Sequence, residues 1–104
     1  MGIAYDPNLS LIFRALGDDT RLLILTELRK RDDQTLFELC GRMVTEYDMT
    51  LSRQAFTRHL NVLEAAGLIA TSWKGRTKIH SLTAEALEAL VEPWIRPFIE
   101  GEQT

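Results

Sequence analysis

The sequence lacks the features that define several whole classes of protein. It holds one cysteine, Cys40, in 104 residues, so no disulfide can form within the chain, and a reducing cytoplasm is the expected location. No apolar run approaches the length of a membrane span, so no membrane partner is expected. Residues 1–10 lack the basic and apolar segments of a secretory signal, which argues against export.

Motifs for catalysis are missing as well. The chain has no glycine-rich phosphate loop and no nucleophile elbow, and no Ser–His or Cys–His pair can be identified. We therefore expect that the protein is not an enzyme.

What is present is the composition of an ordinary globular chain. It is 45% hydrophobic and 26% charged, with a formal net charge of −3. A chain of this length is expected to form one domain, spanning residues 1–104. A core this small often gains stability by pairing with a second copy, which favours a homodimer.

Positive charge is concentrated in one stretch of this acidic chain. Residues 52–80 hold five lysines and arginines and one acidic residue, whereas the rest is strongly acidic. A local cationic surface on an acidic body favours a protein that docks on DNA in one orientation. A solvated charged helix and an ordinary hairpin would carry the same charges, so charge alone leaves both interpretations open.

Apolar spacing predicts two helices in the first third of the chain. The first covers about residues 8–17 and ends at Gly17. Asp18 or Asp19 can cap the second, because a short carboxylate accepts the free N–H groups of a first turn. This second helix, expected to end near Arg31, is apolar around most of its first half and should therefore lie at the centre of the core.

Capping residues predict a helix-turn-helix over about residues 35–67. Thr35 and Glu38 form a T-x-x-E capping box that begins a third helix. Ser52 is a suitable N-cap for a fourth helix, and Gly67 is suited to end it.

The fourth helix should bury Phe56, Leu60 and Leu63 and present a polar face on its other side. Arginine can pair with guanine, and glutamine or asparagine with adenine, so this face can read DNA. The predicted DNA-binding residues, including the basic residues of the following hairpin, are Ser52, Arg53, Gln54, Thr57, Arg58, His59, Asn61, Lys74, Arg76 and Lys78.

Two short alternating strands follow within about residues 68–82 and predict a hairpin wing. Gly75 can take a positive φ in the turn between them. Trp73 could support the hairpin or stack on a sugar, and support is the favoured interpretation. His80 is expected to be a hydrogen-bonded residue of the wing.

A final helix is expected over about residues 83–99. Pro93 should kink it, because proline deletes one backbone donor and crowds the previous turn, and Pro97 should fray its end. With the first helix it offers more apolar surface than a small monomer should expose, which predicts a homodimer. The predicted dimer-interface residues are Leu9, Ile12, Phe13, Leu16, Leu87, Leu90, Val91, Trp94, Ile95 and Phe98.

Three segments, in this order and spacing, resemble the ArsR-type repressors. Residues 15–21, ALGDDTR, are similar to the opening of those proteins, and residues 52–69 resemble their recognition helix and its exit. Gly75-Arg76, followed by residues 79–82, resembles their wing. The fold class expected is all-α with a small β-hairpin wing: a winged helix-turn-helix of about five helices.

The resemblance implies a repressor that dimerises through its first and last helices and is released from double-stranded DNA by an inducer, which the sequence does not identify. An isologous dimer would place two recognition helices about one DNA turn apart, roughly 34 Å, and so select an inverted repeat. The alternative is a winged helix that binds other proteins through its apolar seams. The basic surplus of residues 52–80 argues against it.

Metal sensing, which some ArsR-type proteins perform, finds little support. Residues 37–42, FELCGR, look like the metal box on the third helix of those members but retain one thiol, and Arg42 stands where a ligand is expected. The last helix has three glutamates but no cysteine or histidine. We predict no metal and no cofactor. Cys40 is favoured as a buried thiol over a redox-reactive one, and His59 as a packing or phosphate-contacting residue over a ligand.

Overall fold

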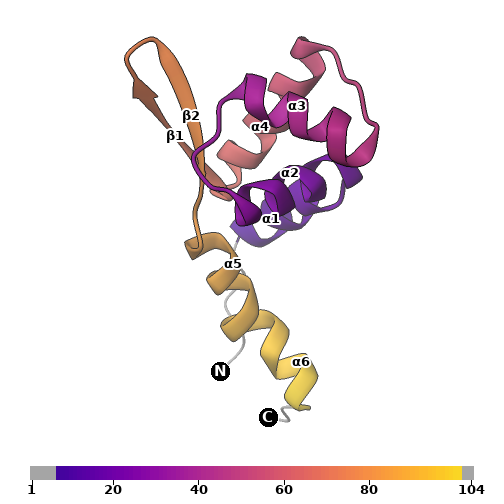
Figure 1. Ribbon diagram of the computed structural model, residues 1–104. Coiled ribbons are helices and arrows are strands. Elements are labelled where there is room, and N and C mark those ends of the chain that lie inside the picture. Colours follow the sequence, from indigo (N-terminus) through magenta and orange to yellow (C-terminus); the bar gives the residue numbers. More distant parts are fainter. Residues whose placement is uncertain (1–6, 102–104) are drawn as a thin grey trace.

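Helices and one hairpin make up the protein, in a computed structural model that describes residues 7–101 (Figure 1). Most of the amino-terminal stretch considered for export lies outside these residues. The elements are α1 (Pro7–Leu16), α2 (Asp19–Lys30), α3 (Leu36–Tyr47), α4 (Arg53–Ala65), β1 (Ile69–Lys74), β2 (Thr77–Leu82), α5 (Glu85–Leu90), the π-helical turn η1 (Val91–Ile95) and α6 (Arg96–Glu100). Since α5, η1 and α6 follow one another without a break, we call them together the carboxy-terminal helix. The prediction of five helices and a two-stranded wing is confirmed.

The helix starts follow the capping residues of the sequence. The Asp18 carboxylate accepts a hydrogen bond from the backbone N–H of Arg21 at 3.1 Å. Thr35 and Glu38 form the complete reciprocal capping box. Ser52 accepts a backbone N–H in the first turn of α4. Each cap satisfies donors that a helix leaves free at its first turn.

The core lies between α2, α3 and α4 and extends beneath β1. Its largest fully buried apolar side chains are Ile24, Leu28, Leu39, Met43, Phe56, Leu63 and Leu68. Ile12 of α1 and Leu90 of the carboxy-terminal helix belong to the same core, with exposed fractions of 4% and 3%. Their predicted place at a dimer interface is therefore corrected, because the single chain already covers them and they have almost no surface left to offer a partner.

The hairpin is antiparallel, with Ile69 opposite Leu82 and Lys74 opposite Thr77. Gly75 has a φ of +65° in the tight turn, a conformation that costs a glycine little. In Figure 1 the hairpin projects from the helices and runs beside α3 and α4.

At Pro93, where a kink was predicted, the carboxy-terminal helix widens into η1. The Arg96 N–H donates to the Val91 carbonyl, five residues back, which is the bonding of a π-helix. The predicted fraying at Pro97 is wrong, since the helix continues to Glu100. Pro97 lies in the first turn of α6, where a missing amide is tolerated.

This helix extends away from the other elements (Figure 1), and the molecule measures 50 × 30 × 22 Å. Between residues 7 and 101, none of the helices combines the length and the apolar character needed to cross a bilayer.

Candidate nucleic-acid interface

The polar face of α4 is exposed, as expected from its buried face of Phe56, Leu60 and Leu63. Five of the residues predicted to bind DNA are exposed along it: Arg53, Gln54, Thr57, Arg58 and Asn61. Ser52 is also exposed, but its hydroxyl oxygen serves as the cap of this helix.

A groove of about 660 Å³ lies between α4 and the wing. Some of the residues predicted to bind DNA line this groove, and the others lie outside it. Arg53, Thr57 and Asn61, one helical turn apart, line the groove from α4, and Arg76 and Lys78 line it from the wing. The predicted residues Gln54, Arg58 and Lys74 are not among the groove-lining residues, whereas the acidic Glu64 of α4 is.

Aromatic side chains stand exposed beside these cations. Phe37, at the start of α3, is 85% exposed, and Trp73 on β1 is 68% exposed, and both line the groove. The exposed surface of Trp73 leaves it free to contact a partner, and its role as a support of the hairpin stays a prediction. Stacking of Trp73 on a sugar stays a prediction.

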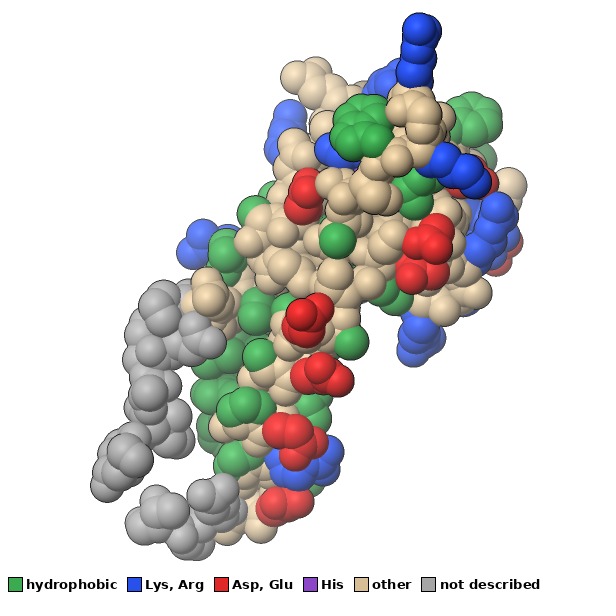
Figure 2. Space-filling model, turned by 90° about the vertical axis from the view of Figure 1, so that its left-hand side faces the viewer, with side chains coloured by type: hydrophobic (Ala, Val, Ile, Leu, Met, Phe, Trp, Pro, Cys, Tyr) green, Lys and Arg blue, Asp and Glu red, His purple; other side chains and the backbone are tan. Residues whose placement is uncertain are grey.

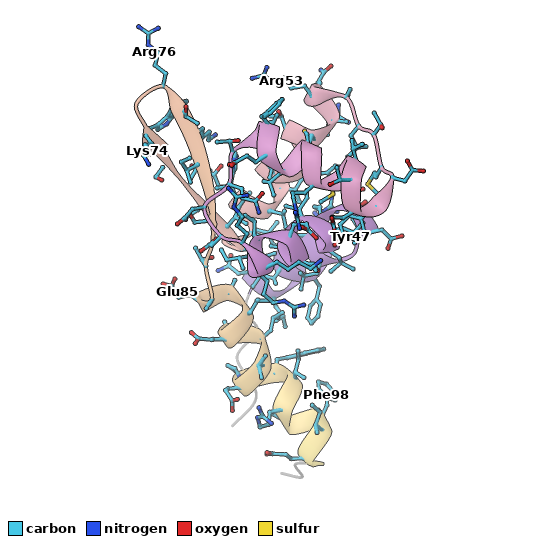
Figure 3. The ribbon with its side chains drawn as sticks, in the orientation of Figure 1. Tyr47, Arg53, Lys74, Arg76, Glu85 and Phe98 are labelled. Atoms are coloured by element: carbon cyan, nitrogen blue, oxygen red, sulfur yellow. The ribbon has the colours of Figure 1, made fainter. Side chains whose placement is uncertain are left out.

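Charge is segregated along the long axis of the molecule. In Figure 3, Arg76 at the tip of the wing and Arg53 at the start of α4 extend toward the same end, whereas Phe98 lies at the other end. Figure 2 shows blue basic side chains around the wing end and red acidic ones along the carboxy-terminal helix. The cationic end is therefore the one that suits a polyanion.

The base of the wing is tied to the loop between α2 and α3. Gln34 and His80 exchange two backbone hydrogen bonds of 3.0 and 2.8 Å, and the His80 Nδ1 lies 3.0 Å from the Gln34 carbonyl oxygen. Asp32 accepts the Leu82 N–H at 2.8 Å. Burial lowers the pKa of His80, although the bond to Gln34 acts in the opposite direction. His80 is thus the hydrogen-bonded wing residue predicted from the sequence, although its partner lies 46 residues away.

His59 points inward from α4 rather than toward the exposed face. Its ring is half-buried, and its Nδ1 lies 3.1 Å from Arg21 Nη1 and 3.7 Å from Asp18 Oδ2, both of the α2 end. This geometry supports the packing interpretation of His59.

A buried charged cluster lies beneath the interface, between α2 and α3. The fully buried Glu27 carboxylate accepts hydrogen bonds from Arg42 Nε at 2.8 Å, Lys30 Nζ at 3.1 Å and the Tyr47 hydroxyl at 2.5 Å. Burial alone would raise the pKa of Glu27, but these hydrogen bonds outweigh it and lower the pKa to about 2. Arg42, noted in the sequence only for replacing a metal ligand, is thus the counter-ion of an acid on another helix.

Comparison with known proteins decides the family. No protein-family model matches the chain. The uncharacterized HTH-type transcriptional regulator YuzN of Bacillus subtilis (strain 168) is 47% identical over 88 residues, which cover 85% of this chain and 96% of YuzN. The solved ArsR-like transcriptional regulator from Rhodococcus sp. RHA1 is 35% identical, with a TM-score of 0.73, and the match covers 90% of this chain and 82% of that one. The chain belongs to the ArsR family of winged helix-turn-helix transcriptional regulators.

A second relative is a transcriptional repressor. The transcriptional repressor SdpR of Bacillus subtilis (strain 168) is 30% identical over 88 residues, covering 85% of this chain and 89% of SdpR.

The third helix of this ArsR-family chain carries its single thiol half-buried in the floor of the groove. Burial raises the pKa of Cys40, and nearby Arg53 offsets part of that effect. Within residues 7–101, histidine, cysteine, aspartate and glutamate nowhere form a group of three that could hold a metal ion.

The residues predicted to form a dimer interface lie on α1 and the carboxy-terminal helix, and two of them, Ile12 and Leu90, belong to the core. Phe13, Trp94 and Phe98 form an edge-to-face aromatic row, with ring centroids 5.1 Å apart for Phe13 and Trp94 and 4.7 Å apart for Trp94 and Phe98. Phe98 is 70% exposed, and Ile99, which the sequence interpretation missed, is 72% exposed. Figure 2 shows an apolar stripe along this helix beside the acidic one. The other predicted members, Leu9, Leu16, Leu87, Val91 and Ile95, are half-buried or exposed.

Proposed function

We propose that this chain binds double-stranded DNA as a homodimer and represses transcription at an inverted-repeat operator. The observation that carries the proposal is the exposed polar face of α4 beside the wing, at the cationic end of an otherwise acidic chain. A cytoplasmic location follows from a partner of this kind. The similarity to the repressor SdpR supports repression as the outcome of binding.

In this proposal α4 enters the major groove. Arg53, Gln54, Thr57 and Arg58 lie in its first two turns and read bases and nearby phosphates, with Asn61 one turn farther along. Lys74, Arg76 and Lys78 hold the flanking backbone or minor groove. Ser52 and His59 act mainly by holding α4 in place, because both are already engaged within the protein.

The dimer forms through the exposed apolar surface of α1 and the carboxy-terminal helix. Phe98 and Ile99 leave most of their surface uncovered at the end of a helix that extends away from the core. Apolar patches of this kind on small proteins mark association sites. Pairing of two copies by a twofold axis would set the two α4 helices one DNA turn apart.

DNA binding is tested by selecting bound sequences from a random pool and measuring affinity against salt. Gln54→Ala should relax preference at one position of the selected site. Arg76→Ala should weaken binding to all sequences and reduce the salt slope by about one unit for each phosphate that Arg76 neutralises in the wild type. Arg29→Ala is the matched control, because Arg29 is an exposed arginine on α2. It should leave the sequence preference, the affinity and the salt slope unchanged. No enriched sequence, together with a normal dimer, would favour the protein-binding alternative.

Dimerisation is tested by sedimentation at micromolar concentration. The wild-type protein should sediment as a dimer, and Phe98→Glu combined with Ile99→Glu should produce a monomer. Leu22→Glu is the control, because Leu22 is also an exposed apolar residue, 43% exposed, but lies on α2. A wild-type monomer would refute this part of the proposal.

A further inference from the structure

One guanidinium group joins the end of α1 to the recognition helix. Arg21, in the first turn of α2, donates from Nε to the Ala15 carbonyl at 2.7 Å and from Nη2 to the Arg14 carbonyl at 3.1 Å. Both carbonyls belong to the last turn of α1. Its third nitrogen, Nη1, lies 3.1 Å from His59 Nδ1 on α4. Arg21 therefore contacts both α1 and α4 from a third helix.

The contact is suited to arginine chemistry. A guanidinium has only donors, so Arg21 Nη1 is the donor toward His59 Nδ1. Asp18 fixes the backbone of Arg21, because its carboxylate accepts the Arg21 backbone N–H at 3.1 Å. The same carboxylate lies 3.7 Å from His59 Nδ1. The planar fork of arginine can serve two carbonyls and a ring at once, which a lysine ammonium cannot do in the same geometry.

The position of this contact gives it a consequence for DNA binding. α1 packs on α2, and α2 packs on α4. α2 therefore connects α1, which belongs to the proposed dimer interface, to the recognition helix α4. Arg21 lies on this connection and bonds to both α1 and α4. A small rotation of α4 relative to α1 would be doubled in the dimer, because the twofold axis applies it to both recognition helices.

We propose that Arg21 is a positioning residue that sets the separation of the two recognition helices, acting through His59 and without touching DNA. The inference rests on the proposed function above, since it requires a dimer that binds two half-sites. It predicts that Arg21 matters for binding two half-sites together and not for binding one.

The test compares a full inverted-repeat operator with a single half-site, for the wild type, Arg21→Gln and Arg21→Lys. Arg21→Gln should bind the full operator about tenfold more weakly, which is less than the full loss of two charge-assisted hydrogen bonds because these bonds position α4 and do not contact DNA. Its half-site affinity and salt slope should match those of the wild type. Arg21→Lys keeps the charge but not the fork, so it should resemble Arg21→Gln. Arg29→Gln, on the exposed side of the same helix, should behave as the wild type.

Distance measurement in the free dimer provides a second readout that does not depend on DNA. A spin label at Ala65→Cys, exposed at the end of α4, is introduced together with Cys40→Ser so that one thiol is labelled in each protomer. Arg21→Lys should broaden the label-to-label distance distribution. An unchanged distribution would overturn the proposal, even if Arg21→Gln fails to fold.

The DNA measurements separate the remaining explanations. An equal loss of affinity on the full operator and on the half-site would overturn the positioning role. A reduced salt slope would show instead that Arg21 contacts a phosphate directly. A wild-type protein that dimerises but binds neither DNA would refute the proposed function, whatever the distance distribution shows.

Discussion

The buried carboxylate of Glu27 makes a quantitative prediction about stability. Glu27 is completely buried, yet it is charged because Arg42, Lys30 and Tyr47 all donate to it. Replacing it by glutamine keeps the shape of the side chain and removes the charge. The variant leaves two cationic partners without their acid, which is why we expect destabilisation and not a neutral change.

The size of the effect follows from the pKa of the carboxyl group. A pKa of about 2 in the folded protein against 4.5 in the unfolded chain corresponds to about 3 kcal/mol of stability at pH 7. Water reaches the side chains of Lys30 and Arg42, which are 47% and 36% exposed, and screens part of this interaction. We therefore expect Glu27→Gln to lower the free energy of unfolding by about 2 kcal/mol at pH 7.

Acidification distinguishes this charge effect from a simple packing defect. Because the folded-state pKa of Glu27 is lowered, its contribution is complete above about pH 4.5 and is lost as the pH falls toward 2. The difference between the wild type and Glu27→Gln in urea unfolding should therefore shrink to less than half between pH 7 and pH 3.

Glu46→Gln is the matched control, because Glu46 is an exposed glutamate on α3, and it should change stability by less than about 0.5 kcal/mol. Equal stability of the wild type and Glu27→Gln at pH 7 would refute the reasoning. A difference of the same size at pH 7 and pH 3 would show that packing, and not charge, is responsible.

Three further predictions concern the wing, a helix end and the thiol. Burial lowers the pKa of His80, so the folded state binds fewer protons than the unfolded chain, and unfolding in urea should become easier as the pH falls below about 6.5; His80→Gln should lose less stability between pH 7.5 and pH 5.5. Gly67→Ala should destabilise the protein by about 1 kcal/mol, because the φ of Gly67 is +74°. Gly41→Ala should stabilise it by about 0.5 kcal/mol, because Gly41 lies within α3 with open space around it. Thermal unfolding measures both changes. The raised pKa of Cys40 leaves little thiolate at neutral pH, so Cys40→Ser should leave DNA affinity unchanged with and without zinc, cadmium or arsenite; release of the wild type by stoichiometric metal, abolished in Cys40→Ser, would contradict this.

The parts of the fold that could be predicted are those encoded by neighbouring residues. The caps at Asp18, Thr35 and Ser52 and the glycines at 67 and 75 act within one turn of the chain, and each appears where its local chemistry places it. The order of elements followed from these signals, which is why the winged helix could be recognised before any tertiary packing was known.

The parts that could not be predicted depend on partners distant in sequence. Burial of Glu27 was not predicted, because the groups that stabilise its charge include Arg42 and Tyr47, which lie 15 and 20 residues away on another helix. Likewise, an apolar face on a helix does not tell which residues face the chain's own core, and Ile12 was placed on the wrong side for that reason. For His59, only the fold revealed Arg21 as its neighbour.

The π-helical turn at Val91–Ile95 has a consequence for exchanging helices between related proteins. Such a turn acts as one extra residue in an α-helix, and each residue of an α-helix rotates the following side chains by about 100°. Suppose that a chimera joined part of this helix to a relative whose helix is α-helical throughout. The wide turn would then be lost, and Trp94 and Phe98 would turn away from Phe13 unless one residue were removed. Chimeric subunits should therefore be joined before Glu85, so that the whole helix, including its wide turn, is transferred as a unit.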